Sequence, residues 1–453
     1  MGLGKTIQTI AFMLDRAGKG ASLVIAPTSV VPNWEKEIAR FAPSLRSLPV
    51  NASKDRSTII ANAGAGDVVI SSYGILVNSS EAFSAREWNV ICLDEAHQIK
   101  NRWTKMSKAA MELRSDARLI LTGTPVQNSI NDLWNLFQFI NPGILGKFDN
   151  FRGRFYSPDE DEAKKRLEEL KTITQPFILR RTKQDVLSEL PKKTEIDYIV
   201  HQSEEEARQY ESMRADISDG VLALTMPKPI AQIQNQQGGQ QPQQAQQAPA
   251  QMQPAMEISI FQGLTKLRMA CCSMELQNPV WEGGSSKLSE LHFLLEHIYS
   301  EESKILIFSQ FTSFLAMAKN VLKDFKIPFL YLDGATPMSQ RSELVEDFQS
   351  GRCPVFLISL KAGGLGLNLT EANYVILLDP WWNPSIEEQA IDRAYRIGQT
   401  RDVIVIRMIT ENTIEQKIVQ LQDKKRNISD NILSGTGASG KLTFEEIREM
   451  LSR

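Results

Sequence analysis

Residues 90–97 read Val-Ile-Cys-Leu-Asp-Glu-Ala-His, a short apolar run that leads directly into two adjacent carboxylates. Such a run is typical of a strand buried in a parallel sheet. At the end of that strand, Asp94 can reach the water shell of a magnesium ion and Glu95 can lie beside an attacking water. Phosphoryl transfer needs both roles within a few ångströms. The stretch therefore predicts half of a nucleotide site, with a solvated acidic helix cap as the alternative.

The other half of such a site stands at the start of the sequence. Residues 1–6, Met-Gly-Leu-Gly-Lys-Thr, match the second half of a phosphate-binding loop that includes Gly2 and Gly4. In this loop Lys5 reaches the terminal phosphates and the Thr6 hydroxyl holds magnesium. Because Met1 falls on the third position of the loop, we expect an N-terminally truncated chain that binds its nucleotide poorly and hydrolyses it slowly or not at all.

Two stretches of the chain share an alternation of apolar runs with helical patterns. The 453 residues are 42% hydrophobic, enough for two or three packed domains. Residues 1–145 and 285–434 both show the alternation, so we predict an α/β fold with two similar parallel-sheet lobes. The predicted strands are Ser22–Ala26, Val68–Ser72, Val90–Leu93, Arg118–Leu121, Ile305–Phe308, Phe329–Leu332, Val355–Ile358, Val375–Leu378 and Val403–Ile406.

Residues 146–284 differ from both lobes, since Phe148 to Leu224 is charged and predicted to be mostly helical; we interpret 146–284 as a helical appendage between the lobes. Ser203-Glu204-Glu205-Glu206 predicts a capping box at a helix start. Residues 232–253 are mainly Gln with Pro, Ala and Gly, which predicts a disordered insert. Residues 435–453 predict a glycine loop and a C-terminal helix. They only resemble a second phosphate loop, because Leu442 stands where a hydroxyl must bind magnesium.

The overall composition gives no sign of a disulfide-rich, zinc-binding or membrane-spanning protein. With 51 Lys and Arg against 54 Asp and Glu, the net charge is −3, so nucleic-acid binding must come from a local basic track. The four cysteines show neither a disulfide framework nor zinc-site spacing, which fits a reducing compartment. No apolar run approaches the roughly 18 residues that span a bilayer, and no signal peptide is visible. We expect no membrane partner.

Seven motifs, in order, resemble those of the Swi/Snf family of helicase-like, DNA-dependent ATPases. They are MGLGKTIQTI, APTSVVPNW, LDEAHQIKN, LTGTPVQNS, LISLKAGGLGLNLT, DPWWNP and DRAYRIGQ, and they cover nearly the whole chain. The resemblance implies two RecA-like lobes with ATP and Mg²⁺ in the cleft between them. It also implies translocation along duplex DNA rather than strand separation. We expect a monomer in the cytoplasm, on a prokaryotic nucleoid, with the nucleus as the alternative.

The second lobe has its own candidate site residues. Gln389, Arg393 and Arg396 fall on a predicted helix, at spacings that place them on one face. The two arginines can act as arginine fingers on transition-state phosphates, and an exposed helix surface is the alternative. Gly366 closes a glycine run in which the backbone can approach a ligand closely. Residues 379–384, Asp-Pro-Trp-Trp-Asn-Pro, can offer an aromatic wedge to DNA, although paired tryptophans favour packing.

The resemblance also points to DNA contacts in both lobes, made mostly by hydroxyls and backbone amides on phosphate oxygens. The residues concerned are Pro27, Thr28, Ser72, Tyr73, Ser309, Gln310, Gly334 and Thr336, with Arg180 and Arg181 as a basic brace on the appendage.

Three hypotheses about function follow. The first is an ATP-dependent motor that translocates on duplex DNA and remodels protein–DNA complexes, with a DNA-bound protein as its client. The second is a DNA- or protein-binding fragment without turnover, because half of the phosphate loop is absent. The third, an RNA helicase, is disfavoured by the RIGQ and DPWWNP motifs.

Overall fold

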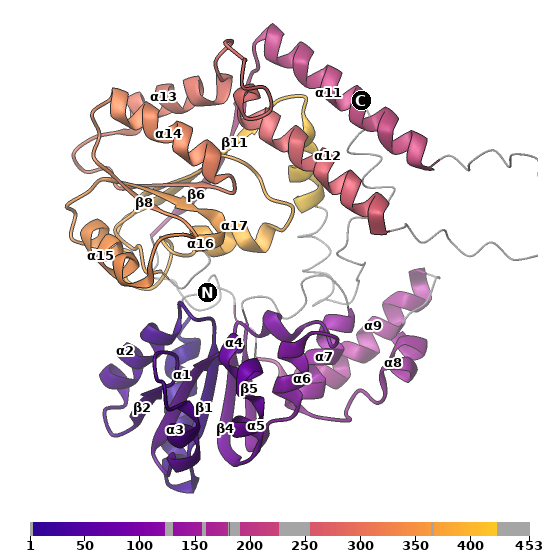
Figure 1. Ribbon diagram of the computed structural model, residues 1–453, viewed down its shortest axis with the longest axis vertical. Coiled ribbons are helices and arrows are strands. Elements are labelled where there is room, and N and C mark those ends of the chain that lie inside the picture. The colour runs from indigo at the N-terminus through magenta and orange to yellow at the C-terminus, as the bar shows by residue number, and fades with distance from the viewer. Residues whose placement is uncertain are drawn as a thin grey trace, which may run out of the picture.

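The computed structural model describes residues 3–122, 130–155, 160–179, 181, 191–225, 254–363 and 367–423. Figure 1 shows two sheets in two separate lobes, with helices around each. This confirms the predicted α/β fold with two parallel-sheet lobes. Several predicted features lie outside the described residues, namely Gly2, Arg180, Gly366, the Gln-rich insert 232–253 and the C-terminal segment 435–453.

The first lobe is built on a parallel sheet in the order β2-β3-β1-β4-β5. Its strands are β1 (Ser22–Ala26), β2 (Arg46–Pro49), β3 (Asp67–Ser72), β4 (Glu87–Asp94) and β5 (Arg114–Leu121). Its helices are α1 (Lys5–Asp15), α2 (Val31–Phe41), α3 (Arg56–Asn62), α4 (Tyr73–Asn78), α5 (Ser80–Ser84), α6 (Lys105–Met111) and α7 (Ile130–Ile140). Short 3₁₀ turns cover Ala17–Lys19 and Ala96–Ile99.

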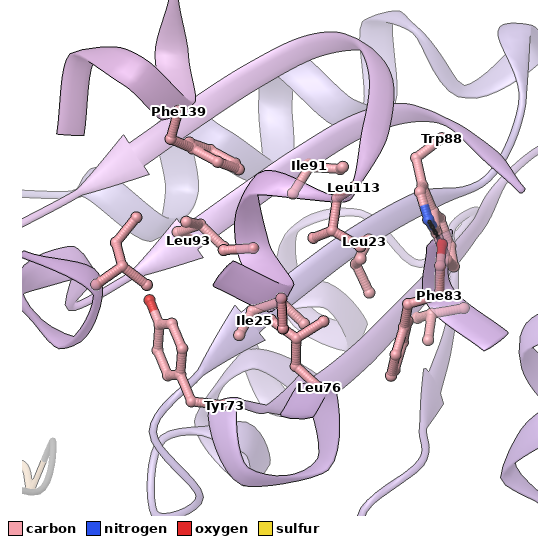
Figure 2. Packing of buried hydrophobic residues seen from close by; sticks show 14 of the residues in the cluster. Leu23, Ile25, Tyr73, Leu76, Phe83, Trp88, Ile91, Leu93, Leu113 and Phe139 are labelled. Atoms are coloured by element: carbon pink, nitrogen blue, oxygen red, sulfur yellow. Dashed lines mark hydrogen bonds between the residues drawn. The ribbon is translucent and has the colours of Figure 1, made fainter. Parts of the chain in front are cut away.

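Helices cover both faces of this sheet, which explains why β1 is buried at all five of its residues. One face packs against α1 and α2 through residues such as Met13, Trp34 and Ile38. The other face packs against α4, α6 and α7, and Figure 2 shows the Tyr73 ring beside Ile25 and Leu76 in this core. The carboxyl end of the buried strand β4 therefore sits on a rigid base.

The second lobe is built on a parallel sheet in the order β6-β11-β10-β7-β9-β8. Its strands are β6 (Lys193–Val200), β7 (Ile305–Ser309), β8 (Phe329–Leu332), β9 (Val355–Ser359), β10 (Tyr374–Leu377) and β11 (Val403–Thr410). Its helices are α13 (Ser286–Ile298), α14 (Thr312–Asp324), α15 (Met338–Gln349), α16 (Leu360–Gly363) and α17 (Pro384–Ile391). Helices α13 and α14 cover one face, and α15, α16 and α17 cover the other.

Residues 146–284 include one strand, β6, while their other described elements are helical. Strand β6 pairs in parallel with β11 along its full length, so this part of the predicted appendage belongs to the second sheet. The strand is not predicted from the sequence because it is an edge strand with one face towards solvent. Its alternating Lys193, Glu195 and Asp197 give it the charged character of an exposed helix.

The helices of the predicted appendage divide between the two lobes (Figure 1). Helices α8 (Phe148–Phe155) and α9 (Glu160–Thr174) share a hydrophobic cluster with α7 of the first lobe. Helices α11 (Glu204–Thr225) and α12 (Pro254–Cys272) pack together and against the helical residues 414–423 of the second lobe. The capping box of α11 is confirmed, since Glu206 N donates to Ser203 Oγ at 3.2 Å and Ser203 N donates to Glu206 Oε2 at 3.0 Å.

The helices in the described ranges, with the gaps given above, include none that is long and apolar enough to cross a membrane.

A buried ion pair fastens α13 to residues 414–423. Lys287 Nζ lies 2.7 and 2.6 Å from the two carboxylate oxygens of Glu415, and both side chains are at most 1% exposed. Burial lowers the pKa of Lys287, but Glu415 together with Cys272 and Cys271 outweighs that effect, so the pKa lies above its usual value and the ammonium stays charged. Glu415 also accepts a hydrogen bond from the backbone N–H of Thr410 at 2.8 Å.

Replacing Lys287 with Met is expected to lower the free energy of unfolding by about 3–5 kcal/mol, because it leaves the Glu415 carboxylate buried without its counter-charge. Urea unfolding followed by circular dichroism measures the loss. Lys287→Met with Glu415→Gln removes both charges and should recover much of the stability. Equal losses in the single and double variants would contradict this account.

Candidate nucleotide site

The residues predicted to hold phosphate stand at the start of α1. Gly4 precedes the helix in the left-handed region, with φ 75°, which favours glycine. Lys5 is the first helical residue and lies close enough to both Asp94 and Glu95 to lower the pKa of each. Thr6 follows in the first turn, where the helix leaves backbone N–H groups without intrahelical partners. This arrangement suits an anion at the amino end of α1.

Asp94 is the last residue of β4 and is 8% exposed. Its Oδ2 accepts a hydrogen bond from Trp34 Nε1 at 2.9 Å, and its Oδ1 accepts one from the backbone N–H of Glu95 at 2.9 Å. Burial and the neighbouring Glu95 raise the pKa of Asp94, while Trp34 and Lys5 oppose that rise. The carboxylate is thus held in a fixed orientation by a tryptophan that the sequence-based analysis missed.

Glu95 has an unusual backbone, with φ 47° in a region that non-glycine residues seldom adopt. Strain of this kind persists where the surrounding structure fixes a functional side chain. Burial raises the pKa of Glu95, but His97, Lys5 and Arg393 outweigh it, so the pKa lies below its usual value. The carboxylate is therefore ionised at neutral pH and can accept a proton or orient a water.

Glu95 and His97 each have one buried side-chain atom without a hydrogen-bond partner among the described residues. Glu95 Oε2 lies 3.4 Å from His97 Nδ1, and both atoms are buried without a hydrogen-bond partner in the described part of the chain. Buried polar atoms are rarely left unsatisfied, so such a pair indicates a position for a bound water or ligand group. His97 was not among the predicted site residues, although the Asp-Glu-Ala-His sequence places it two residues from Glu95.

The two predicted arginine fingers do not lie on a helix with Gln389, which corrects the sequence-based expectation. Helix α17 ends at Ile391, where the Asp392 N–H closes the last turn, so Gln389 is helical while Arg393 and Arg396 stand in the turns beyond. The repeat of three and four residues continues past the helix, and the sequence pattern alone does not reveal where the helix stops.

The structure nevertheless brings these arginines to the first lobe. Arg393 is 5% exposed; burial lowers its pKa, while the nearby charges of Glu95 and Asp94 oppose that change. Burial also lowers the pKa of Arg396, which is opposed by Glu37 of α2. Arg396 Nε is buried without a hydrogen-bond partner among the described residues. Basic groups of the second lobe thus face acidic groups of the first.

The residues predicted to contact DNA, apart from Arg180 and Arg181, lie at or just after the carboxyl ends of strands in both lobes, but they differ in exposure. Three of them are buried: Tyr73 donates its hydroxyl to the Asp94 carbonyl oxygen at 2.8 Å, Ser72 caps α4, and Ser309 bonds to Asp379. The exposed ones are Thr28, Gly334 and Arg181, while Pro27, Gln310 and Thr336 are half-buried. DNA binding by these residues stays a prediction.

Comparison with known families matches both halves of the chain. Residues 1–276 match the SNF2-related domain, and residues 286–398 match the helicase conserved C-terminal domain.

The chain is also similar to individual proteins and structures. It is 38% identical over 465 residues to YwqA of Bacillus subtilis, provisionally named an ATP-dependent helicase/translocase, covering 100% of this chain and 48% of that protein. It is 33% identical over 478 residues to the mouse SWI/SNF-related matrix-associated actin-dependent regulator of chromatin subfamily A member 1, covering 100% and 43%. The Sulfolobus solfataricus SWI2/SNF2 ATPase core in complex with dsDNA is 34% identical, with 99% and 91% coverage and a TM-score of 0.44.

The chain spans less than half the length of these two curated relatives. The family match, by contrast, extends over both lobes and includes the residues that form the site. The chain therefore belongs to the Swi/Snf family of helicase-like ATPases.

Proposed function

We propose that this chain is the motor of a DNA translocase, which hydrolyses ATP on duplex DNA and uses the energy to move along it and remodel protein–DNA complexes. The observation that carries the proposal is the approach of Arg393 in the second lobe to Asp94 and Glu95 in the first. A site completed by both lobes allows DNA to control hydrolysis through the placement of one lobe against the other.

Each residue of the site has a role that its surroundings favour. Lys5 neutralises phosphate charge at the amino end of α1. Glu95, ionised and strained, orients or deprotonates the attacking water beside His97. Arg393 and Arg396 supply positive charge where negative charge develops on the transferred phosphoryl group. Arg393 is buried and Arg396 is half-buried, and their partial desolvation strengthens this electrostatic effect.

The donor set also fits a magnesium nucleotide. Magnesium in such sites is held by one or two carboxylates, waters and substrate phosphates rather than by a protein cage. Asp94 supplies a buried, oriented carboxylate and Thr6 a hydroxyl, and the described residues hold no cluster of three or more His, Cys, Asp or Glu side chains suited to a metal. When bound, the ion neutralises charge that develops between the phosphates.

The proposal is tested by ATP hydrolysis of the gene product that contains this chain, with duplex DNA, single-stranded DNA, RNA or no nucleic acid. We expect duplex DNA to raise the rate about tenfold or more, without preference for base sequence, because the predicted contacts are to phosphates. Binding should weaken steeply with salt, since each neutralised phosphate releases counterions.

Three results would contradict the proposal. Stimulation by RNA and not by DNA would indicate an RNA helicase. DNA binding without any turnover would indicate a binding protein. Hydrolysis that depends on one DNA sequence would show that base contacts, and not the backbone, control the site.

A further inference from the structure

Arg268 of α12 lies in a cage of three aromatic rings. Its side chain is 1% exposed, although a guanidinium carries a full charge at neutral pH. The guanidinium carbon lies 4.7 Å from the ring centre of Trp381, 5.3 Å from that of Trp382 and 5.1 Å from that of Phe311. The paired tryptophans therefore pack around a cation.

The same guanidinium is tied to the carboxyl end of β10. Its Nη2 donates to the Pro380 carbonyl oxygen at 2.8 Å and pairs with Asp379 Oδ2 at 3.3 Å. Asp379 is also fully buried and accepts hydrogen bonds from the Ser309 hydroxyl and from the backbone N–H of Gln310. Arg268 Nε is buried without a partner among the described residues. Arg268 thus fixes the point where the chain leaves the sheet.

The residues after this point lead to the arginines of the nucleotide site. The Trp381 N–H donates to Glu387 Oε1 at 2.6 Å, and Asn383 caps α17 through the N–H of Ser385 at 3.1 Å. Beyond α17, the carbonyl oxygen of Arg393 accepts from the N–H of Leu369 at 3.0 Å. Within the segment, the N–H of Asp392 donates to the Glu388 carbonyl oxygen at 2.8 Å, so successive short contacts connect Arg268 to the turn that carries Arg393.

Packing alone does not account for a charge in this cage. A methionine would fill the apolar space without the cost of desolvating a cation, and apolar replacements of buried ion pairs are often as stable. The guanidinium adds a fixed orientation of its partners, because its planar group contacts a carbonyl oxygen, a carboxylate and aromatic faces at defined angles.

We propose that Arg268 is a positioning residue that locks residues 379–396 to α12 and so sets where Arg393 and Arg396 lie against Glu95. The effect of Arg268 on hydrolysis rests on the proposed function. Its effect on the position of residues 379–396 does not, since that effect depends only on contacts within the second lobe and α12.

The experiment compares four variants with the wild-type form of the gene product that contains this chain. Arg268→Met removes the positive charge but leaves the Asp379 carboxylate buried without its ion-pair partner. The double variant Arg268→Met with Asp379→Asn removes both charges, so that the protein should still fold. Arg268→Lys keeps the charge and loses the planar fork. Lys266→Met, an exposed position on the same helix, is the matched control.

Two measurements are made on each. Amide hydrogen exchange over residues 380–396 should quicken about tenfold in the double variant, with β7 and β9 unchanged, because local opening precedes global unfolding. On duplex DNA, kcat should fall about tenfold while KM for ATP stays within about twofold, since misplaced arginines weaken the transition state more than ATP binding. For Arg268→Lys, the exchange rate and kcat should lie between those of the wild type and of the double variant. Lys266→Met should match the wild type in both.

The outcomes distinguish the positioning role of Arg268 from the proposed function in ATP hydrolysis. Unchanged exchange over 380–396, or faster exchange spread evenly over the second lobe, overturns the positioning role whether or not ATP is hydrolysed. Faster exchange with unchanged kcat overturns the link to Arg393 and Arg396. A wild-type protein without turnover refutes the proposed function, and the exchange data then still decide the positioning role.

Discussion

Replacing Glu95 with Gln is expected to lower the DNA-stimulated rate of ATP hydrolysis about 10²–10⁴-fold, the usual contribution of a general base. The amide keeps the shape of the side chain and its place in the left-handed turn. It loses the negative charge that His97, Lys5 and Arg393 stabilise; the same three residues lower the pKa of Glu95. ATP and DNA binding should therefore persist while the chemical step fails.

Single-turnover hydrolysis and separate binding assays distinguish these effects. Glu112→Gln, which neutralises an exposed carboxylate of the same lobe, is the matched control and should behave as the wild type. If the Glu95→Gln protein keeps more than about a tenth of the wild-type rate, Glu95 is not the general base.

Replacing Arg393 with Ala is expected to reduce kcat about 10³-fold or more, as loss of an arginine finger does, with little change in ATP affinity. Arg393 is buried against acidic groups of the other lobe, so its charge acts at the point where the lobes meet. Arg393→Lys should recover only part of the rate, because an ammonium lacks the planar fork.

The control for Arg393 is Arg352→Ala, an exposed arginine of the second lobe that pairs with Asp347. Steady-state kinetics at saturating duplex DNA give kcat and KM for each variant. A loss of ATP affinity at an unchanged maximal rate would mean that Arg393 binds the ground state and is not a finger.

The fold could be predicted largely from the sequence because buried parallel strands are continuous apolar runs. All nine predicted strands are present, and strands such as β1, β7 and β9 are buried at every residue. The two strands that were not predicted, β2 and β6, lie at sheet edges. β2 has only four residues and ends in proline, and β6 is charged on its open face, so neither carries the apolar signal.

The site residues that could be predicted are those that fall in short recognisable motifs. Asp94 and Glu95 adjoin a strand, and Lys5 and Thr6 stand in a recognisable loop. Trp34, which orients Asp94, is 60 residues away from it, and no local pattern connects the two. The same holds for Arg268, which lies 111 residues from Asp379. Contacts of this kind follow from tertiary packing, which sequence periodicity does not encode.

The division of the helices between the lobes offers a way to measure any movement of one lobe against the other. Helix α9 is packed on the first lobe and α11 on the second, so a dye on each would report the distance between the lobes during the proposed cycle of ATP hydrolysis. All four native cysteines are buried, and burial raises the pKa of each thiol, so native thiols should label slowly. Cysteines introduced at the exposed positions Thr172 and Gln209 would therefore take the dyes selectively, and energy transfer between them would report the lobe movement that the proposed function requires.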